Sequence, residues 1–218
     1  MNIIEISRRD LESLGVKPSS DTRVYFHPLR IVGTVFWKRF GKMIELAEPS
    51  KNQTALDFGC GHGLFLPTLS RNYGNVIGLD VRALPATENI LKKFNCKNTK
   101  VYKMDGNNLS FTDETFDAVF CADVLEHFKD MDRPLGEIRR VLRPGGKIVI
   151  NTPLENPFFK VARAMIGYKK PADHYHSAKE VAEKVGEYFS IRKIWRYPTP
   201  FRTASVLEIL VAHKEEGG

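Results

Sequence analysis

The sequence predicts an α/β fold in which a mostly parallel sheet carries helices on both faces. Apolar strand patterns alternate with amphipathic helical patterns between about residues 54 and 152, and such alternation requires parallel strands with right-handed crossovers. The first strand pattern runs into a glycine-rich turn that opens a helix. The last two strand patterns are separated by only a few residues, which predicts an antiparallel hairpin at the end of the sheet.

Each expected element has its own signal in the sequence. Apolar residues at helical spacing predict the helices, and short apolar runs bounded by polar residues predict the strands. Ser177 and Glu180 form a capping box that opens the last helix. The expected helices lie at 29–47, from about 64 onward, at 83–94, at 137–142 and from 178 onward. The expected strands lie at 55–58, 75–80, 100–104, 116–121, 147–152, 189–197 and 206–213.

Length and composition exclude several classes of protein. The chain of 218 residues is long enough for one domain with a full core. No apolar run approaches the roughly 18 residues of a transmembrane helix, and the N-terminus lacks the order of a signal peptide. Cys60, Cys96 and Cys121 are widely spaced, so they predict neither a disulfide framework nor a thiolate metal site. We therefore expect a cytoplasmic protein.

The net charge of +7 is concentrated in one part of the chain. Residues 156–203 carry ten basic and four acidic side chains, whereas residues 51–155 carry fourteen and thirteen. A local excess of this kind predicts an anionic partner or surface at that segment.

The rest of the chain is organised around the glycine turn within residues 55–65. Gly59, Gly61 and Gly63 stand at every second position, where they let the backbone adopt positive φ and let a ligand approach the main chain. A dinucleotide fingerprint would place its third glycine one residue later. Asp57 precedes the turn, and a carboxylate there would repel a pyrophosphate and attract an α-ammonium group. The turn therefore favours an adenosyl ligand that ends in an amino acid.

Two more acids follow the next two strands. Asp80 ends the strand at 75–80, about 20 residues after the turn, where a carboxylate can accept hydrogen bonds from both ribose hydroxyls. Asp105 follows the strand at 100–104. Because parallel strands present their carboxyl ends at one edge of a sheet, we expect these acids and the glycine turn to line one crevice.

These residues resemble motif I of the class I S-adenosylmethionine (SAM)-dependent methyltransferases, an acid followed by G-x-G-x-G. Residues 116–128 resemble the "fDvv…LEH" segment of the methyltransferases related to ubiquinone and menaquinone biosynthesis. The resemblance implies a Rossmann-like sheet with one antiparallel strand near the C-terminus and SAM as cofactor. It implies that Asp57 and the turn hold the methionine end, Asp80 the ribose and Asp105 the adenine. The implied cofactor-binding residues are Asp57, Gly59, Cys60, Gly61, Gly63, Asp80, Val81, Met104, Asp105, Gly106 and Cys121.

The acceptor side contains several histidines. His127, His174 and His176 are candidates to remove a proton from an acceptor or to bind it. Asp123, Glu126 and His127 would share one helical turn and could hold a divalent ion, as some relatives with E-x-x-E-H at this place do. The alternative, which we expect, is that Glu126 and His127 orient the helix and that no metal binds. The N/D-P-P-Y run of base-amino methyltransferases is absent from this strand end.

The predicted domains are a helical cap at 1–49 and a SAM-binding domain at 50–218, with a substrate-side insertion at about 153–176. The helix at 29–47 is amphipathic and basic, so it either packs on the domain as a cap over the cofactor cleft or touches a membrane surface. The apolar and basic residues 158–166 of the insertion have a similar character.

The predicted function is transfer of a methyl group from SAM to O, N or C of a small-molecule or lipid-linked acceptor. The alternatives are an RNA or protein methyltransferase and a non-catalytic SAM-binding protein. We expect peripheral contact with an anionic membrane surface, no nucleic-acid partner, and a monomer or homodimer. The complete set of three acids favours catalysis over a binding role.

Overall fold

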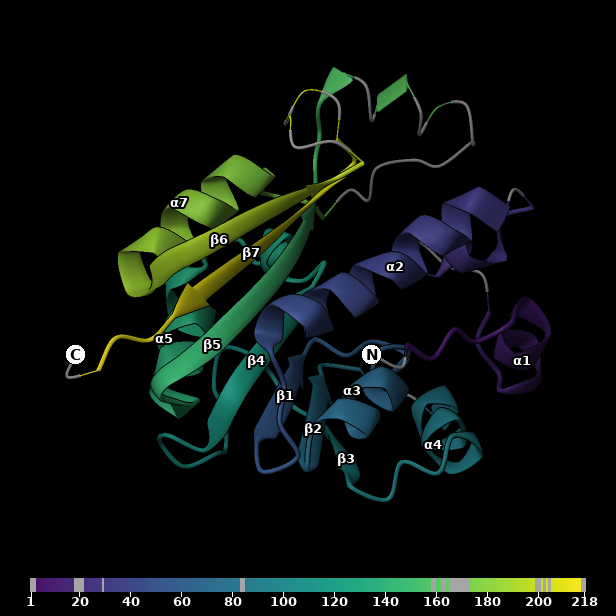
Figure 1. Cartoon of the computed structure of the whole chain (residues 1–218), viewed down its shortest axis with the longest axis horizontal. Helices are drawn as coiled ribbons and strands as arrows, with labels where there is room; N and C mark the ends of the chain where they lie inside the picture. Colours follow the sequence, from purple (N-terminus) through teal and green to yellow (C-terminus); the bar gives the residue numbers. More distant parts are fainter. Residues whose placement is uncertain are drawn as a thin grey trace. The chain divides into compact units, whose positions relative to one another are not determined.

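The computed structural model describes residues 3–17, 22–28, 30–82, 85–157, 160, 161, 164, 173–198, 201, 203 and 205–216. The chain divides into two compact units, residues 1–106 and residues 107–218. Its strands form one seven-stranded sheet in the order β3-β2-β1-β4-β5-β7-β6 (Figure 1). Most of the predicted insertion, including the segment 158–166, lies outside the described residues.

The first unit contains three strands with helices before and between them. Its sheet is fully parallel, and β2 pairs with β1 on one side and β3 on the other. Its strands are β1 (Thr54–Phe58), β2 (Asn75–Asp80) and β3 (Thr99–Lys103). Its helices are α1 (Arg8–Ser13), η1 (Arg23–Phe26), α2 (Arg30–Ala47), α3 (Leu66–Asn72) and α4 (Pro85–Lys93).

The parallel register of this sheet brings the ends of its strands together. Phe58 at the end of β1 pairs with Leu79, and Asp80 at the end of β2 pairs with Lys103 at the end of β3. The residues that follow these strands therefore emerge at one edge, as the sequence predicts.

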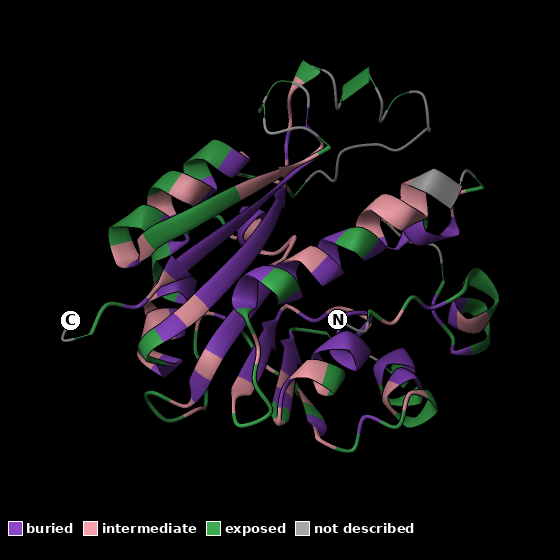
Figure 2. Ribbon diagram, in the orientation of Figure 1, coloured by how far each residue is buried: buried purple, intermediate pink, exposed green. Residues whose placement is uncertain are grey.

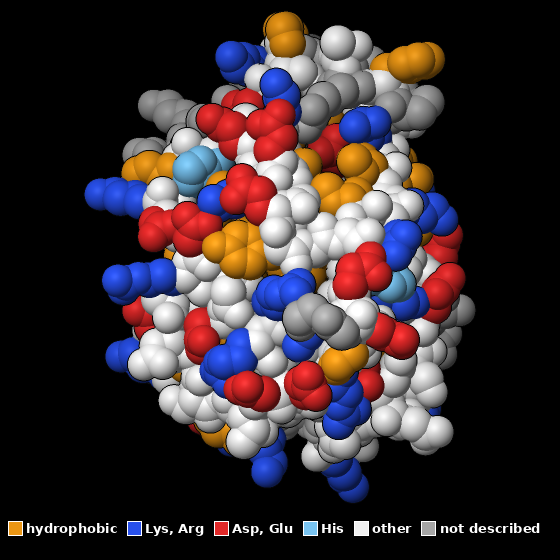
Figure 3. Space-filling view, turned by 90° about the vertical axis from the view of Figure 1, so that its left-hand side faces the viewer, with side chains coloured by type: hydrophobic (Ala, Val, Ile, Leu, Met, Phe, Trp, Pro, Cys, Tyr) orange, Lys and Arg blue, Asp and Glu red, His pale blue; other side chains and the backbone are white. Residues whose placement is uncertain are grey.

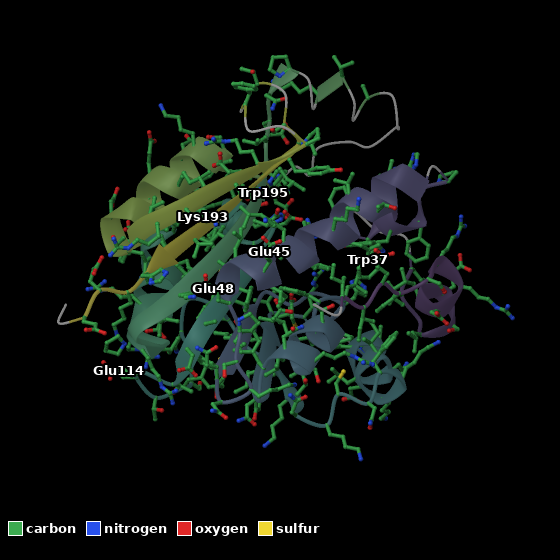
Figure 4. All side chains as sticks on the ribbon, viewed as in Figure 1. Trp37, Glu45, Glu48, Glu114, Lys193 and Trp195 are labelled. Carbon is green, nitrogen blue, oxygen red and sulfur yellow. The ribbon has the colours of Figure 1, made fainter. Side chains whose placement is uncertain are left out.

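Helix α2 is the first long element of the chain, and it confirms the helix expected at 29–47. Its second half is buried and packs by aromatic contacts within the first unit. The ring of Trp37, labelled in Figure 4, lies 4.8 Å from that of Tyr25, and Phe40 stacks on Phe65 at 4.4 Å between ring centroids. Since Phe65 comes just after the glycine turn, these contacts place the second half of α2 beside the turn, whereas its role as a cap over the cofactor cleft remains a prediction. Within the described parts of the chain, every helix is too short or too polar to cross a bilayer.

The second unit contains the other four strands. In it, β4 and β5 are parallel, whereas β7 is antiparallel to both of its neighbours, β5 and β6. Its strands are β4 (Phe116–Ala122), β5 (Leu142–Pro153), β6 (Ser190–Tyr197) and β7 (Leu207–His213). Its helices include η2 (Leu125–His127), α5 (Asp132–Val141) and α7 (Ala178–Tyr188). A mostly parallel sheet with one reversed strand near the C-terminus is the predicted fold class, which is confirmed.

Burial in the second unit follows from the position of each strand. Strands β4, β5 and β7 are largely buried, whereas β6 lies at the edge and is largely exposed (Figure 2). Lys193 and Trp195 come from this edge strand (Figure 4). Helix α7 begins with the predicted capping box, in which the Ser177 hydroxyl accepts a hydrogen bond from the Glu180 N–H.

Helix α5 begins at Asp132, five residues before the start that the sequence predicts. Pro134 stands in its first turn, where the missing N–H has no intrahelical partner to lose, so it opens the helix and does not end it. Leu135, Ile138 and Val141 form the buried face.

The surface around α7 carries charges of both signs (Figure 3). Lys184 lies 2.7 Å from Asp132 and 2.8 Å from Glu187, and Lys179 lies 3.5 Å from Glu183. Basic side chains on this helix are therefore paired with acids, and the helix does not present a uniformly basic face.

Candidate active site

The glycine turn after β1 has the backbone conformation that the sequence predicts. Gly59, Gly61 and Gly63 have φ of 75°, 52° and 77°, a backbone region that residues with a Cβ rarely adopt. The Cys60 N–H donates to the Leu79 carbonyl at 2.8 Å, which ties the turn to the end of β2. The turn therefore exposes main chain at the carboxyl edge of the sheet.

Replacing Gly63 by alanine should disrupt this turn. A Cβ at Gly63 would lie 2.6 Å from Thr87 Cγ2, a buried side chain on α4, in addition to the strain of positive φ. We expect Gly63→Ala to lower the free energy of unfolding by about 2 kcal/mol in chemical denaturation.

Gly136 on α5 provides the control, because a Cβ there would meet no atom within 4 Å. Gly136→Ala should stabilise the protein by about 0.5 kcal/mol, since alanine is the better helix former. Equal effects of the two substitutions would show that the turn does not need a glycine at position 63.

Asp57 lies beneath the turn on β1 and is almost completely buried, with 2% of its surface exposed. Its Oδ2 atom has no hydrogen-bond partner among the described residues. Burial, and then the nearby charge of Asp80, raise the pKa of Asp57 to about 8. A buried carboxylate oxygen without a donor is suited to a cationic ligand group, so this residue fits the α-ammonium end of the implied cofactor.

Asp80 at the end of β2 joins the turn to the second strand. Its Oδ2 accepts a hydrogen bond from the Gly61 N–H at 3.0 Å. Its Oδ1 accepts from the backbone N–H of Arg82 at 2.9 Å and from its Nε at 3.1 Å. Arg82 was not predicted as a site residue, although an arginine two residues after an acid at a strand end could have indicated it. The structure thus brings Asp57, Asp80 and the glycine turn together.

The end of β3 supplies the remaining predicted cofactor residues of the first unit. The Met104 N–H donates to the Asp80 carbonyl at 2.9 Å, which holds the two strand ends together. Asp105 is exposed, Gly106 is buried, and Val81 after β2 is 58% exposed. The exposure of Val81 and Asp105 at this edge is compatible with the predicted cofactor contacts, which remain predictions.

The buried cysteines do not look reactive. Burial, then the charges of Asp57 and Asp80, raise the pKa of the Cys60 thiol, so it is not a thiolate nucleophile. Cys121 lies on β4 in the second unit and is fully buried, so its predicted cofactor contact remains a prediction.

The histidines predicted on the acceptor side lie in the second unit. Glu126 and His127 come from η2, and His174 comes from the segment before α7. One ligand atom from each of these three residues lies within 4.8 Å of the others. Glu126 is completely buried, and the His127 and His174 rings meet edge to face at 4.6 Å. Together these groups could hold a divalent cation, and the expectation from the sequence that no metal binds remains a prediction.

Asp123 does not belong to this cluster, so the hypothesis that it shares a helical turn with Glu126 and His127 is wrong. Asp123 precedes η2 and has a φ of 55°, outside the helical region. Its Oδ1 accepts a hydrogen bond from Asn151 Nδ2 on β5. The positive φ turns its backbone out of the helical path, and the carboxylate is used to join β4 to β5.

His176 is also separate from the cluster. Its Nε2 lies 3.3 Å from the carbonyl oxygen of Lys129, so it contacts the backbone after η2. Asp173, which was not predicted, lies beside His127, with its Oδ2 3.0 Å from His127 Nδ1. The two residues are 46 positions apart in the sequence, so no local pattern could indicate this contact.

The comparison with known families matches residues 56–150 to the family described as "Methyltransferase domain". Among curated relatives, a ubiquinone biosynthesis O-methyltransferase of Mesorhizobium japonicum is 29% identical over 140 residues, which cover 58% of this chain and 52% of the relative. A demethylmenaquinone methyltransferase of Corynebacterium kroppenstedtii is 32% identical over 103 residues, which cover 47% of this chain and 43% of the relative. A tRNA U34 carboxymethyltransferase of Nautilia profundicola is 30% identical over 128 residues, which cover 57% of this chain and 42% of the relative. The chain thus spans about half the length of these relatives.

Solved structures agree in fold. The N-methyltransferase NodS of Bradyrhizobium japonicum, in complex with S-adenosyl-L-homocysteine, superimposes with a TM-score of 0.68 at 17% identity, covering 97% of this chain and 100% of NodS. At 17% identity, this structural similarity shows only that the two proteins share a fold. Residues 56–150 thus match a methyltransferase domain, and about half of the chain is similar to a SAM-dependent methyltransferase of ubiquinone biosynthesis.

Proposed function

We propose that this chain transfers a methyl group from SAM to a small-molecule or lipid-linked acceptor with a phenolic hydroxyl, of the type found in quinone precursors. Asp57 carries the cofactor part of the proposal, because it is a buried side chain beside a glycine turn, and its Oδ2 receives no hydrogen bond from the residues that the structure describes. The names of the ubiquinone and menaquinone relatives support the acceptor class.

Each residue at the strand ends has a role in this proposal. Asp57 binds the α-ammonium group, and the backbone between Gly59 and Gly63 approaches the methionine part. Asp80 accepts hydrogen bonds from the ribose, for which the Arg82 Nε contact at 3.1 Å must loosen. Asp105 accepts from the adenine amine, with Val81 and Met104 against the ring. These contacts orient the cofactor and exclude water from it.

The acceptor must lose its proton as the new bond forms. The sulfonium group of SAM supplies an activated methyl group. When the phenolic oxygen forms its bond to the methyl carbon, the carbon–sulfur bond breaks and its electron pair stays on sulfur. His127 takes the phenolic proton, with His174 beside it, and the proton later passes to solvent. His176 supports the loop through its contact with Lys129.

Calorimetric titration with SAM and with S-adenosyl-L-homocysteine tests the cofactor. Incubation with methyl-labelled SAM, using 3,4-dihydroxybenzoate and a lipid extract as acceptor probes, tests the reaction. Micromolar binding of both cofactor forms and label in a phenolic ether would support the proposal. Binding of neither form would overturn it, and binding with label in amines only would overturn the phenolic acceptor.

Asp80→Ala should weaken SAM binding at least tenfold, because the ribose loses its charged hydrogen-bond acceptor, worth about 1.5–3 kcal/mol. Calorimetry measures the affinity, and circular dichroism checks that the fold is intact. Glu88→Ala on α4 is a matched control, since Glu88 is an exposed acid of the same unit. Unchanged affinity in Asp80→Ala would remove Asp80 from the site.

Peripheral contact with an anionic membrane, and the cytoplasmic location that goes with it, are also part of the proposal. They are motivated by the apolar and basic residues of α2 and by the net charge of residues 156–203. Co-sedimentation with vesicles that contain phosphatidylglycerol measures the contact. If the protein stays in the supernatant at low salt, the membrane part is wrong.

An RNA methyltransferase is the second candidate. The similarity to a tRNA U34 carboxymethyltransferase and the basic excess at residues 156–203 favour it. RNA binding that falls steeply with salt, together with transfer of label to tRNA, would support this function in place of the first. RNA binding that is weak even at low salt would exclude the RNA methyltransferase function.

A further inference from the structure

Residues 173–177 are fastened to η2 and the residues after it by several contacts within the second unit. The Tyr175 N–H donates to the Glu126 carbonyl at 2.8 Å. His176 contacts the Lys129 carbonyl, and the Lys129 ammonium lies 5.5 Å from the centre of the Tyr175 ring. The capping box at Ser177 then fixes the start of α7. The position of Asp173 is therefore set by its neighbours as well as by its own side chain.

The anchored loop places a carboxylate on one specific nitrogen of His127. Asp173 Oδ2 lies 3.0 Å from Nδ1, which is hydrogen-bond distance for a donated N–H. His174 packs its ring against His127 with an angle of 88° between the ring planes, which limits rotation of the His127 ring. A neutral imidazole carries one proton, so a proton held on Nδ1 leaves the lone pair on Nε2.

We propose that Asp173 is a positioning residue that holds His127 in the tautomer whose Nε2 accepts the acceptor's proton. The inference rests on the proposed function, in which His127 is the base. In the reaction Nε2 gains the phenolic proton, Nδ1 keeps its own, and the carboxylate of Asp173 faces the resulting imidazolium. Asp173 does not itself become protonated, and it stabilises the charge that appears on the ring.

Solvent exposure explains why the residue would be needed. The His127 side chain is 34% exposed, and an imidazole in water otherwise prefers to carry its proton on Nε2. In that form Nε2 could not accept a proton. A carboxylate partner on Nδ1 reverses the preference, as carboxylate–histidine pairs do in hydrolases and at metal sites.

Nitrogen NMR of protein labelled at histidine tests the proposal directly, since the two tautomers have different ring-nitrogen shifts. At alkaline pH, His127 of the wild type should carry its proton on Nδ1. His127→Gln assigns the signal by its loss. In Asp173→Ala the proton should move largely to Nε2, and in Asp173→Glu it should return to Nδ1. A wild-type proton on Nε2, or an unchanged signal in Asp173→Ala, would overturn the proposal.

Methyl transfer to 3,4-dihydroxybenzoate gives the second readout. Asp173→Ala should lower kcat about tenfold or more, with the KM for the phenol and the Kd for SAM within threefold of the wild type, and Asp173→Glu should recover most of the rate. Glu183→Ala is the control, because Glu183 is an exposed acid of α7 that pairs with Lys179. An equal loss in both variants would indicate a general effect of surface charge and overturn the assignment.

The two readouts separate failure of this inference from failure of the proposed function. The tautomer is measured without cofactor or acceptor, so it decides the role of Asp173 even if no phenol is methylated. A correct tautomer without methyl transfer would contradict the acceptor class alone. Stoichiometric binding of Zn²⁺ or Mn²⁺ that shifts the His127 and His174 signals together would overturn the proposal, because Nε2 would then be a metal ligand.

Discussion

Asp57→Asn should bind SAM about 100-fold more weakly than the wild type in calorimetric titration. The substitution keeps the shape of the side chain but removes the charge that would face the α-ammonium group in a site shielded from water, where a charged hydrogen bond is worth about 1.5–3 kcal/mol or more. Asp57 is 2% exposed, so solvent cannot replace the lost carboxylate. An affinity within threefold of the wild type would show that the ammonium group binds elsewhere.

The pH dependence of binding gives a sharper test of the same residue. Because burial raises the pKa of Asp57 to about 8, most of the free protein carries a protonated Asp57 at neutral pH. Binding of an ammonium group favours the carboxylate, so binding at neutral pH should release a proton. Affinity should therefore rise from about pH 6 to pH 8, above which the ligand's own α-amino group, with a pKa of about 8, loses its charge.

Proton release is measured by calorimetry in buffers that differ in their enthalpy of ionisation. The wild type should give a heat that depends on the buffer, whereas Asp57→Asn should give a heat that does not. A buffer-independent heat in the wild type would mean that Asp57 is already ionised before the ligand binds.

The same raised pKa predicts that Asp57 costs stability. The folded pKa of about 8 lies above the ordinary value of 3.8, so between these values the folded state holds a proton that the unfolded state has released. Stability from this group therefore falls as pH rises through that window. The free energy of unfolding of free Asp57→Asn at neutral pH should exceed that of the wild type by about 1 kcal/mol or more, as is common when a binding site is relieved of strain. A less stable variant would contradict this prediction.

Part of the site could be predicted from the sequence because its signals are local. Gly59, Gly61 and Gly63 need positive φ within five residues, and the turn has it at all three. Asp80 directly ends a strand, and the parallel register alone brings it to the turn. The fold class follows from the same alternation of strands and helices, which fixes the crossovers before any side chain is placed.

The rest of the site depends on contacts that no local pattern contains. Asp173 meets His127 only because the segment before α7 is fastened to η2. Asp123 leaves its expected helical turn because Asn151, on the neighbouring strand, binds its carboxylate. The burial of Asp57 depends on the packing of the whole first unit, so its raised pKa could not be inferred from its position before a glycine.

His127→Gln should lower kcat for methylation of 3,4-dihydroxybenzoate about 100-fold, within the range that a positioned base contributes to proton transfer. Glutamine can still donate and accept hydrogen bonds but cannot take a proton at neutral pH. The affinity for SAM should remain within threefold of the wild type, because the cofactor residues at the three strand ends lie in the first unit. Stopped-assay rates and calorimetry on the same preparations measure both quantities.

Two further measurements separate a base from a residue that only shapes the site. The rate deficit of His127→Gln should shrink toward alkaline pH, as the phenol, with a pKa of about 10, ionises without help. His213→Gln is the matched control. His213 pairs with Lys147, which lies at the amino end of the part of β5 that is parallel to β4. The segment η2 follows the carboxyl end of β4, so His213 lies at the opposite end of these strands from His127. A rate deficit of His127→Gln that is the same at every pH would show that His127 binds the acceptor and is not its base. In that case, ionisation of the phenol would not restore the contact that the substitution removed.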